Sequence, residues 1–342
     1  MQEKQTWRDI LAEITQDPSE RQRILATLNV KSITLSRWLS GETFPRANKL
    51  YQFLNLYPQY REQILSLLRD EKGMSEFTNP IEDDTPFNIP PEFYIELFKT
   101  RASVTENLYY WTLCNQILQN ALTQLDPNRL GMSLWIARCM PPAAPSQQVR
   151  SLYESEGIGT PPWKENLEHD GMFLGAESLA GHVVTVFHYK VVNDLTAENT
   201  LIPVAYSEYE KSCAIFPILY AGRIAGVLSA ASTQYNYFNA QNRLTLLQKY
   251  ADLTAMLFSP EEFYEPAQIA LHVMPPQKTQ KPLFAHFNDL TRRMMMEASS
   301  RNQPANKNEA EQHVRAQLEE QLLHYAIEHT FHNNNYSEPQ KD

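Results

Sequence analysis

The chain has 342 residues, of which 42% are hydrophobic and 11% aromatic, and it carries a formal net charge of −10. This length allows two or three domains, and the negative charge argues against a protein that coats nucleic acid along its whole surface. No run of about 18 apolar residues occurs, so no membrane-spanning helix is expected. The charged start MQEKQTWRDI lacks the apolar segment of a signal peptide.

The three cysteines, Cys114, Cys139 and Cys213, are far apart and odd in number, which indicates free thiols in a reducing cytoplasm.

Residues 1–70 predict a compact all-helical domain. Pro18 suits the first turn of a second helix, and Asn29 suits the turn after it because Asn tolerates positive φ. Gly41 falls where a left-handed residue closes a helix, and Pro45 prevents its continuation. Apolar residues recur at helical spacing in five short segments, 6–15, 18–30, 32–40, 47–58 and 60–69. Two short helices joined by a tight turn form a helix-turn-helix, whose second helix enters the DNA major groove.

The second helix of this pair combines a polar face with bulky apolar groups. Ile33, Leu35, Trp38 and Leu39 supply the apolar groups, and we expect Leu35 and Trp38 to face inward. Four basic residues and one acidic residue lie between Lys31 and Lys49, a local basic face on an acidic chain. The candidate DNA-binding residues are Lys31, Ser32, Thr34, Ser36, Arg37, Thr43, Arg46 and Lys49.

This segment resembles the recognition helix of the XRE (Cro/repressor-like) helix-turn-helix family in Ser36, Arg37, Trp38, Gly41 and Pro45. The resemblance covers roughly residues 6–69 and implies binding to double-stranded DNA. Two positions depart from the family pattern, because Asn29 replaces the usual turn glycine and Leu25 stands where a small alanine is preferred. The first helix is therefore expected to pack differently. A helical hairpin that binds protein is the alternative interpretation.

Residues 71–91 are rich in proline and acidic side chains and predict a linker. The segment from Glu92 to Leu125 then predicts one long amphipathic helix. It carries more apolar surface than one small sheet can cover, so we expect it to pair with the same helix of a second copy, giving a homodimer.

Residues 132–258 alternate strand and helix patterns. Ala221 and Gly222 separate two β-rich runs, which is a hairpin signal. In chain order the predicted elements are a strand Met132–Met140, a loop Pro141–Trp163, a helix Glu177–His188, a strand in VVNDL, the hairpin strands Cys213–Tyr220 and Arg223–Ala230, and a closing helix Asn239–Phe258.

This order resembles a GAF domain over residues 92–259, with the hairpin signature in Pro217-Ile218, Gly222 and Gly226-Val227-Leu228. PAS-like folds share the sheet and are the structural alternative. The resemblance implies an α+β domain that serves for dimerisation or small-molecule sensing. A pocket between the sheet and the Glu177–His188 helix, roofed by the Pro141–Trp163 loop, would lie near Trp135, Cys139, Tyr206 and Cys213. A filled core at the same place is the alternative.

Residues 260–342 begin with a proline-rich linker and continue as a helical extension. Two helices are predicted, Leu283–Ser300 and Asn308–Phe331. A stripe of apolar side chains on the second is a candidate addition to the dimer interface, formed by Val314, Leu318, Leu322 and Tyr325.

The sequence contains no Gly-rich phosphate loop, HExxH, CxxC or GxSxG motif, so no enzymatic activity, cofactor or metal is expected. The combination predicts a bacterial XRE-GAF type one-component transcription regulator in the cytoplasm. Its expected partners are double-stranded DNA and a second copy of itself, with a small molecule as a further candidate and no membrane. A signalling or assembly adaptor that binds protein partners is the alternative, and a GAF-fold enzyme is a more distant one.

Overall fold

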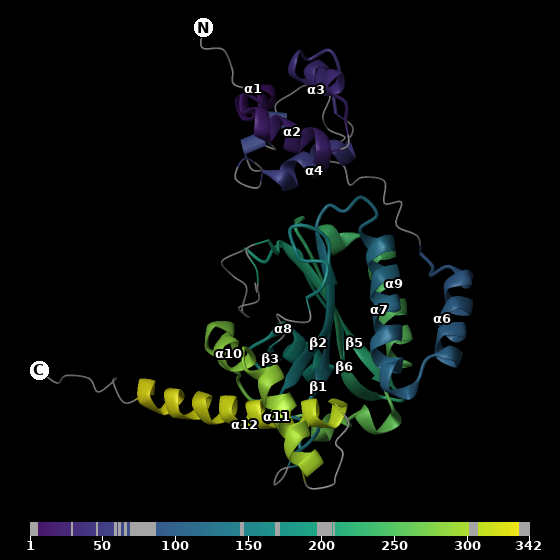
Figure 1. Ribbon diagram of the computed structural model, residues 1–342, viewed down its shortest axis with the longest axis vertical. Helices are drawn as coiled ribbons and strands as arrows, with labels where there is room; N and C mark the ends of the chain where they lie inside the picture. Colours follow the sequence, from purple (N-terminus) through teal and green to yellow (C-terminus); the bar gives the residue numbers. More distant parts are fainter. Residues whose placement is uncertain are drawn as a thin grey trace, which may run out of the picture.

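The computed structural model describes residues 6–28, 30–45, 47–57, 60, 63–64, 67–68, 87–143, 147–167, 172–196, 207, 209–300 and 307–334. Two regions with separate apolar cores are seen, a helical region before residue 69 and a sheet region after residue 86 (Figure 1). The α+β class predicted from the sequence is confirmed.

The helical region contains α1 (Trp7–Ile14), α2 (Pro18–Thr27), α3 (Ser32–Leu39) and α4 (Ala47–Leu56). The Asp17 side chain caps α2 by accepting the backbone N–H of Ser19 at 2.8 Å. One buried cluster joins the four helices, with Trp7, Ile10, Leu11, Ile24, Leu28, Leu35, Trp38, Leu50, Phe53, Leu54, Ile64 and Leu68 at its centre. Asn29 and Arg46 lie outside the described residues.

The second region is built on a six-stranded antiparallel sheet with the strand order β3-β2-β1-β6-β5-β4. The β5–β6 hairpin predicted from the sequence is confirmed, and Ala221 and Gly222 take φ values of 50° and 78° in its turn. The strands are β1 (Met132–Cys139), β2 (Leu152–Gly159), β3 (Phe173–Leu174), β4 (Lys190–Val192), β5 (Ser212–Tyr220) and β6 (Arg223–Ser232).

Helices cover the two faces of this sheet differently. On one face α7 (Glu106–Leu125) and α9 (Gln241–Ala255) lie side by side, and Leu134 and Ile136 of β1 pack against them (Figure 1). On the other face α8 (Leu179–Val186) packs on Ala137 through Val183 and Val184. Alternate residues of β1 therefore belong to two separate cores, as the two-residue period of a strand requires.

The prediction of a single helix from Glu92 to Leu125 is wrong. The chain instead forms α6 (Pro91–Ser103) and α7, because Val104 and Thr105 take extended ψ values of 140° and 152°. β-Branched residues have lower helix propensity, and two of them in sequence favour a break there. Phe93 and Leu97 of α6 pack into the core, so α6 covers apolar surface that a partner molecule was expected to cover.

The prediction of a loop from Pro141 to Trp163 is also wrong in part, because this segment contains β2. Glycines at positions 157 and 159 weaken the strand pattern in the sequence, although both residues pair with β1.

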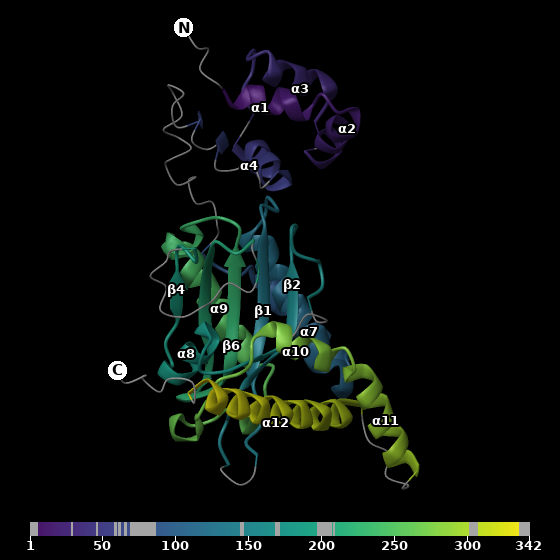
Figure 2. The same cartoon turned by 90° about the vertical axis from the view of Figure 1, so that its left-hand side faces the viewer.

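The C-terminal extension folds onto the sheet region. It comprises α10 (Gln277–Phe284), α11 (Phe287–Ser300) and α12 (Lys307–Asn334), and α12 crosses one end of the sheet in both views (Figures 1 and 2). Val314, Leu318 and Leu322 are buried against Met140 and Phe173 of the same chain. These three residues of the predicted stripe are therefore part of the internal core, which corrects their expected role at a dimer interface, whereas Tyr325 is 39% exposed.

Among the described residues, no helix combines the length and apolar character needed to cross a membrane.

Candidate functional site

The exposed face of α3 is the first candidate site. Ser32, Ser36 and Arg37 are exposed, and Thr34 is half-buried. Leu35 is 0% exposed and Trp38 is 5% exposed, as predicted from their spacing. The polar side chains therefore project away from the helical core along one helix surface.

The end of α3 is fixed by the backbone. Gly41 has a φ of 75°, and its N–H donates to the Trp38 carbonyl at 3.2 Å. The Thr43 N–H donates to the Arg37 carbonyl at 3.2 Å, which keeps exposed Thr43 close to the helix end. Arg37 lies beside Glu42, with 3.7 Å between Nε and Oε2, and both side chains are at least half exposed.

Three further predicted DNA-binding residues lie outside α3 in the sequence: Lys31, Arg46 and Lys49. Lys31 precedes α3 and is exposed, whereas Lys49 on α4 is half-buried. Arg46 lies outside the described residues. Ile33, one of the bulky apolar residues of this helix, has a side chain that is 61% exposed, in contrast to that of Leu35. Ile33 lies one helical turn before Ser36 and Arg37, so the spacing in the sequence already places it on the same face of α3 as these two exposed residues.

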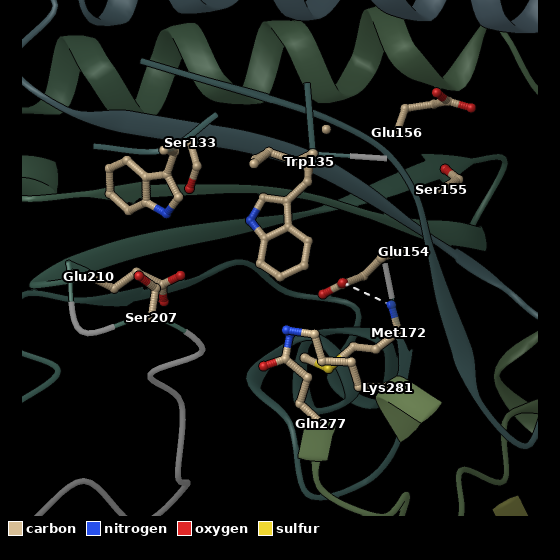
Figure 3. A pocket seen from close by; sticks show the side chains of 13 residues that line it. Ser133, Trp135, Glu154, Ser155, Glu156, Met172, Ser207, Glu210, Gln277 and Lys281 are labelled. Atoms are coloured by element: carbon tan, nitrogen blue, oxygen red, sulfur yellow. Dashed lines mark hydrogen bonds between the residues drawn. The ribbon is translucent and has the colours of Figure 1, made fainter. Parts of the chain in front are cut away.

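The second candidate site is a cavity of about 250 Å³ beside β1 and β2. Its floor comes from the two strands, and its walls come from the segments before β3 and β5 and from α10 (Figure 3). Residues of mixed polarity line it: Ser133, Trp135, Glu154, Ser155, Glu156, Gly157, Trp163, Leu167, Met172, Ser207, Glu210, Gln277 and Lys281.

A β-bulge directs one carboxylate into this cavity. Glu156 pairs with Ile136 and Glu154 pairs with Ala137, so Ser155 is the extra residue between them. Paired residues share a face of the sheet, and Ala137 lies on the same face as Trp135. Glu154 and Glu156, two residues apart, consequently point to opposite faces (Figure 3). Glu154 is 6% exposed, and its carboxylate accepts the Met172 backbone N–H at 3.2 Å.

The cavity depends on a close approach at Gly157, which pairs with Trp135. A Cβ added at Gly157 would lie 3.0 Å from the Leu167 Cβ and 3.2 Å from the Trp135 Cβ. The absence of a side chain therefore lets the segment after β2 lie close to the sheet. Trp163 of that segment contacts Tyr209 edge to face, with 6.3 Å between ring centroids.

The wall contributed by α10 is held by a buried glutamine. Gln280 is 1% exposed, and its side chain bonds both the N–H and the carbonyl of Phe173 at 2.8 Å. It thereby extends the edge strand β3 by one set of hydrogen bonds. Gln277 and Lys281 lie one turn before and one residue after Gln280, and both border the cavity.

The structure brings together only part of the predicted pocket. Trp135 lines the cavity, and Tyr206 lies outside the described residues. Cys139 and Cys213 do not line it, because their side chains are buried in the apolar cluster under α8. Apolar side chains fill the space between the sheet and α8, so the cavity lies farther along β1 and β2 than predicted. The C-terminal contribution was not predicted, because nothing in its sequence specifies where α10 docks.

The buried cysteines are poor nucleophiles. Burial raises the pKa of Cys139 far above its ordinary value, and burial, with Glu210 adding to it, raises the pKa of Cys213 to about 12. Both thiols are therefore protonated at neutral pH. In the part of the chain that the structure describes, no three His, Cys, Asp or Glu side chains are grouped to hold a metal ion.

Comparison with known proteins adds a likeness of fold over about half of the chain. No protein-family model and no curated protein matches the sequence. A type II free methionine-R-sulfoxide reductase from Thermoplasma acidophilum is 17% identical with a TM-score of 0.35, covering 46% of this chain and 98% of its own. The GAF domain of an Acinetobacter phosphoenolpyruvate-protein phosphotransferase is 13% identical with a TM-score of 0.34, covering 48% and 89% respectively. The GAF domain of a Bacillus halodurans sensor histidine kinase is 18% identical with a TM-score of 0.28, covering 42% and 91%.

Proposed function

We propose that this protein is a one-component transcription regulator that binds duplex DNA through α3 and binds a small molecule in the cavity beside β1 and β2. The observation that carries the DNA-binding proposal is the division of α3 into two faces. Leu35 and Trp38 anchor the helix, while Ser36 and Arg37 project from it. An anchored helix with projecting polar side chains is what reading base edges in the major groove requires.

Exposed residues in α3 and just before it suit different kinds of contact. Arg37 can donate two parallel hydrogen bonds to guanine, and Lys31 can neutralise a phosphate. Exposed Ile33 fits against the methyl group of thymine, a contact that needs an apolar side chain on the DNA-facing surface. Together these side chains offer both base recognition and backbone positioning.

A homodimer belongs to this proposal, because one helix-turn-helix makes few base contacts and two copies can read a palindrome. Although α6 covers part of α7, both helices retain exposed apolar side chains. Ile95 and Phe98 lie one turn apart on α6, and Leu108 and Trp111 lie one turn apart on α7. Each is between 47% and 58% exposed. A second copy packed on these helices would cover them, and a monomeric mass by light scattering at micromolar concentration would contradict the dimer.

The cavity is proposed to bind a ligand rather than to catalyse a reaction. Its lining combines two tryptophans with carboxylates and has no cysteine. Cys139 and Cys213 lie in the apolar core with raised pKa values, which disfavours thiolate chemistry. A cytoplasmic regulator that senses a metabolite would need such a site without needing a nucleophile.

Selection of bound sequences from random duplex DNA tests the proposal. The full chain should enrich a defined site, and its affinity should fall steeply with salt concentration. The alternative function is an adaptor whose helical region binds protein, which the exposed apolar Ile33 on α3 also suits. Failure to enrich any sequence, together with binding that does not depend on salt, would favour the adaptor.

A further inference from the structure

We infer that the cavity beside β1 and β2 binds one ring of a neutral polyhydroxy compound, a monosaccharide or a cyclic polyol. Only the sensing role of this ligand rests on the proposed function. Three features of the cavity indicate the ligand class: an unpaired buried hydroxyl, hydrogen-bonding groups of both kinds around an indole, and an aromatic surface in a space suited to a single ring.

The first feature is the hydroxyl of Ser133, which lines the cavity from β1. Ser133 is 2% exposed, and within the described parts of the chain its hydroxyl has no hydrogen-bond partner. Ser133 and Trp135 are two residues apart on β1, so they share the face of the sheet that borders the cavity. A buried hydroxyl left unpaired costs free energy, and a hydrogen bond to a ligand removes this cost.

The second feature is the arrangement of acceptors and donors around Trp135. Glu154 and Glu210 are 6% and 5% exposed and line the cavity, and in the view of Figure 3 they lie on either side of the Trp135 ring. Gln277 and Lys281 lie one turn apart on α10 and contribute N–H donors to the lining (Figure 3). A carboxyl group can accept several hydrogen bonds, so it can serve a ligand hydroxyl and a partner within the protein at once.

A hydroxyl group suits this lining because it both donates and accepts hydrogen bonds. Phosphate and carboxylate ligands only accept, and they would place negative charge beside Glu154 and Glu210. An alkylammonium group only donates, and the ammonium group of Lys281 already lies in the lining. A neutral ring with several hydroxyls can donate to the carboxyl groups and accept from α10 without changing the charge of the cavity.

The third feature is the aromatic surface and the size of the cavity. The C–H bonds on one face of a saturated ring can pack against an indole, whose face is partially negative. Trp163 adds a second indole to the lining beside Trp135, and an edge-to-face contact with Tyr209 orients it. The cavity of about 250 Å³ is smaller than the pockets of about 300–1,000 Å³ that hold drug-sized molecules, so it fits one ring and not a chain of sugars.

Matched probes test the inference on the full chain without DNA. D-glucose, D-galactose, D-mannose and myo-inositol carry hydroxyls around the ring. Tetrahydropyran-2-methanol and cyclohexanol keep the hexose ring and the inositol ring, respectively, with one hydroxyl. At least one polyol should change the tryptophan fluorescence in a saturable way, with half-saturation below about 10 mM. Its one-hydroxyl counterpart should bind about tenfold more weakly or worse, because polar groups of the cavity would be left without partners.

Ser133→Ala separates a binding role from a structural one. This variant should weaken binding of the best polyol about fivefold, because the ligand loses one hydrogen bond. It should not lower the melting temperature, because a hydroxyl without a partner does not stabilise the folded chain. Gln277→Ala, on another wall, should also weaken binding and keeps the test decisive if Ser133→Ala is unstable. The controls Ser299→Ala and Lys278→Ala, at exposed positions on α11 and α10, should leave binding unchanged.

Four outcomes would overturn the inference: no binding of any polyol probe, equal binding of the one-hydroxyl ring, tighter binding of choline or inorganic phosphate than of every polyol, or unchanged polyol binding in both Ser133→Ala and Gln277→Ala. DNA affinity is measured separately on the same preparations. DNA binding without polyol binding would reject the ligand class alone, whereas polyol binding without DNA binding would reject the DNA-binding proposal alone.

Discussion

The side-chain amide of Gln280 pairs with the backbone of Phe173, accepting its N–H and donating to its carbonyl, both at 2.8 Å. The same amide nitrogen also donates to the carbonyl of Pro275 at 2.7 Å. Gln280 of the C-terminal extension thus continues the hydrogen bonding of the edge strand β3. It also fixes α10, the helix that forms one wall of the cavity.

Replacing Gln280 by Ala should destabilise the sheet region by about 1–3 kcal/mol, because buried backbone groups of Phe173 would lose their partners. Urea unfolding of the full chain measures the change. Lys278→Ala, an exposed position on the same helix, is the control and should have little effect. Equal stability of the two variants would show that the amide does not hold α10 in place.

The ion pairs between α12 and the segment before β2 should also matter for stability. Arg150 contacts Glu319 and Glu320, each at 2.9 Å, and the Ser151 hydroxyl donates to Glu319 at 2.6 Å. Because Glu319 is 2% exposed, Arg150→Met should leave a buried carboxylate without its cation and cost about 3–5 kcal/mol.

Thermal or urea unfolding of Arg150→Met tests this value against Arg292→Met on α11. Arg292 pairs with Asp289 on an exposed surface, where such pairs contribute little. A loss no greater than that of Arg292→Met would mean that the Arg150 pair is not needed to dock α12.

The stability of the sheet region should depend on the protonation of Asp126. Burial raises the pKa of Asp126 above its ordinary value of 3.8, although hydrogen bonds from Thr160, Leu130 and Gly131 oppose the rise. The folded state therefore binds this proton more tightly than the unfolded state does. The resulting stabilisation is complete below pH 3.8 and is lost as the pH rises through the folded pKa.

Asp126→Asn should remove this component. As the pH rises above 3.8, the parent should lose unfolding free energy relative to the variant, because only the parent loses the contribution of the bound proton. Urea unfolding of both proteins across the acidic range measures it. A difference that does not vary with pH would contradict the raised pKa.

The three thiols should resist alkylation in the native protein. Cys114, Cys139 and Cys213 are all buried, and burial raises the pKa of Cys139 and Cys213. Iodoacetamide at neutral pH should modify them only after unfolding, because the thiolate is the reactive form. Rapid alkylation of one thiol in the folded chain, located by mass spectrometry, would reopen thiol chemistry as a function.

Local features of the fold could be predicted from the sequence. The Ala221-Gly222 turn between two β-rich runs specified the β5–β6 hairpin, and the spacing of Leu35 and Trp38 specified the buried face of α3. Both follow from periodicity and turn chemistry within a few residues. The exposure of Ile33 was not predicted, because a helix of two turns leaves the edge of an apolar face uncertain.

The cavity could be predicted only in part. Trp135 was placed near it because residue alternation along β1 is regular. Glu154 was not placed near the cavity, because the bulge at Ser155 depends on pairing between strands and leaves no sequence signature. The α10 wall depends on a tertiary contact, Gln280 with Phe173, between residues 107 positions apart.

The central claim is that α3 reads DNA, and fluorescence anisotropy on the duplex recovered by selection tests it most directly. Arg37→Ala should weaken binding to that duplex by about 1–3 kcal/mol, whereas the charge-matched control Arg292→Ala on α11 should bind like the parent. Lys31→Ala should instead weaken binding to all duplexes and reduce the salt slope by about 1. If Arg37→Ala binds the selected duplex and unrelated duplexes as tightly as the parent does, α3 is not the recognition helix.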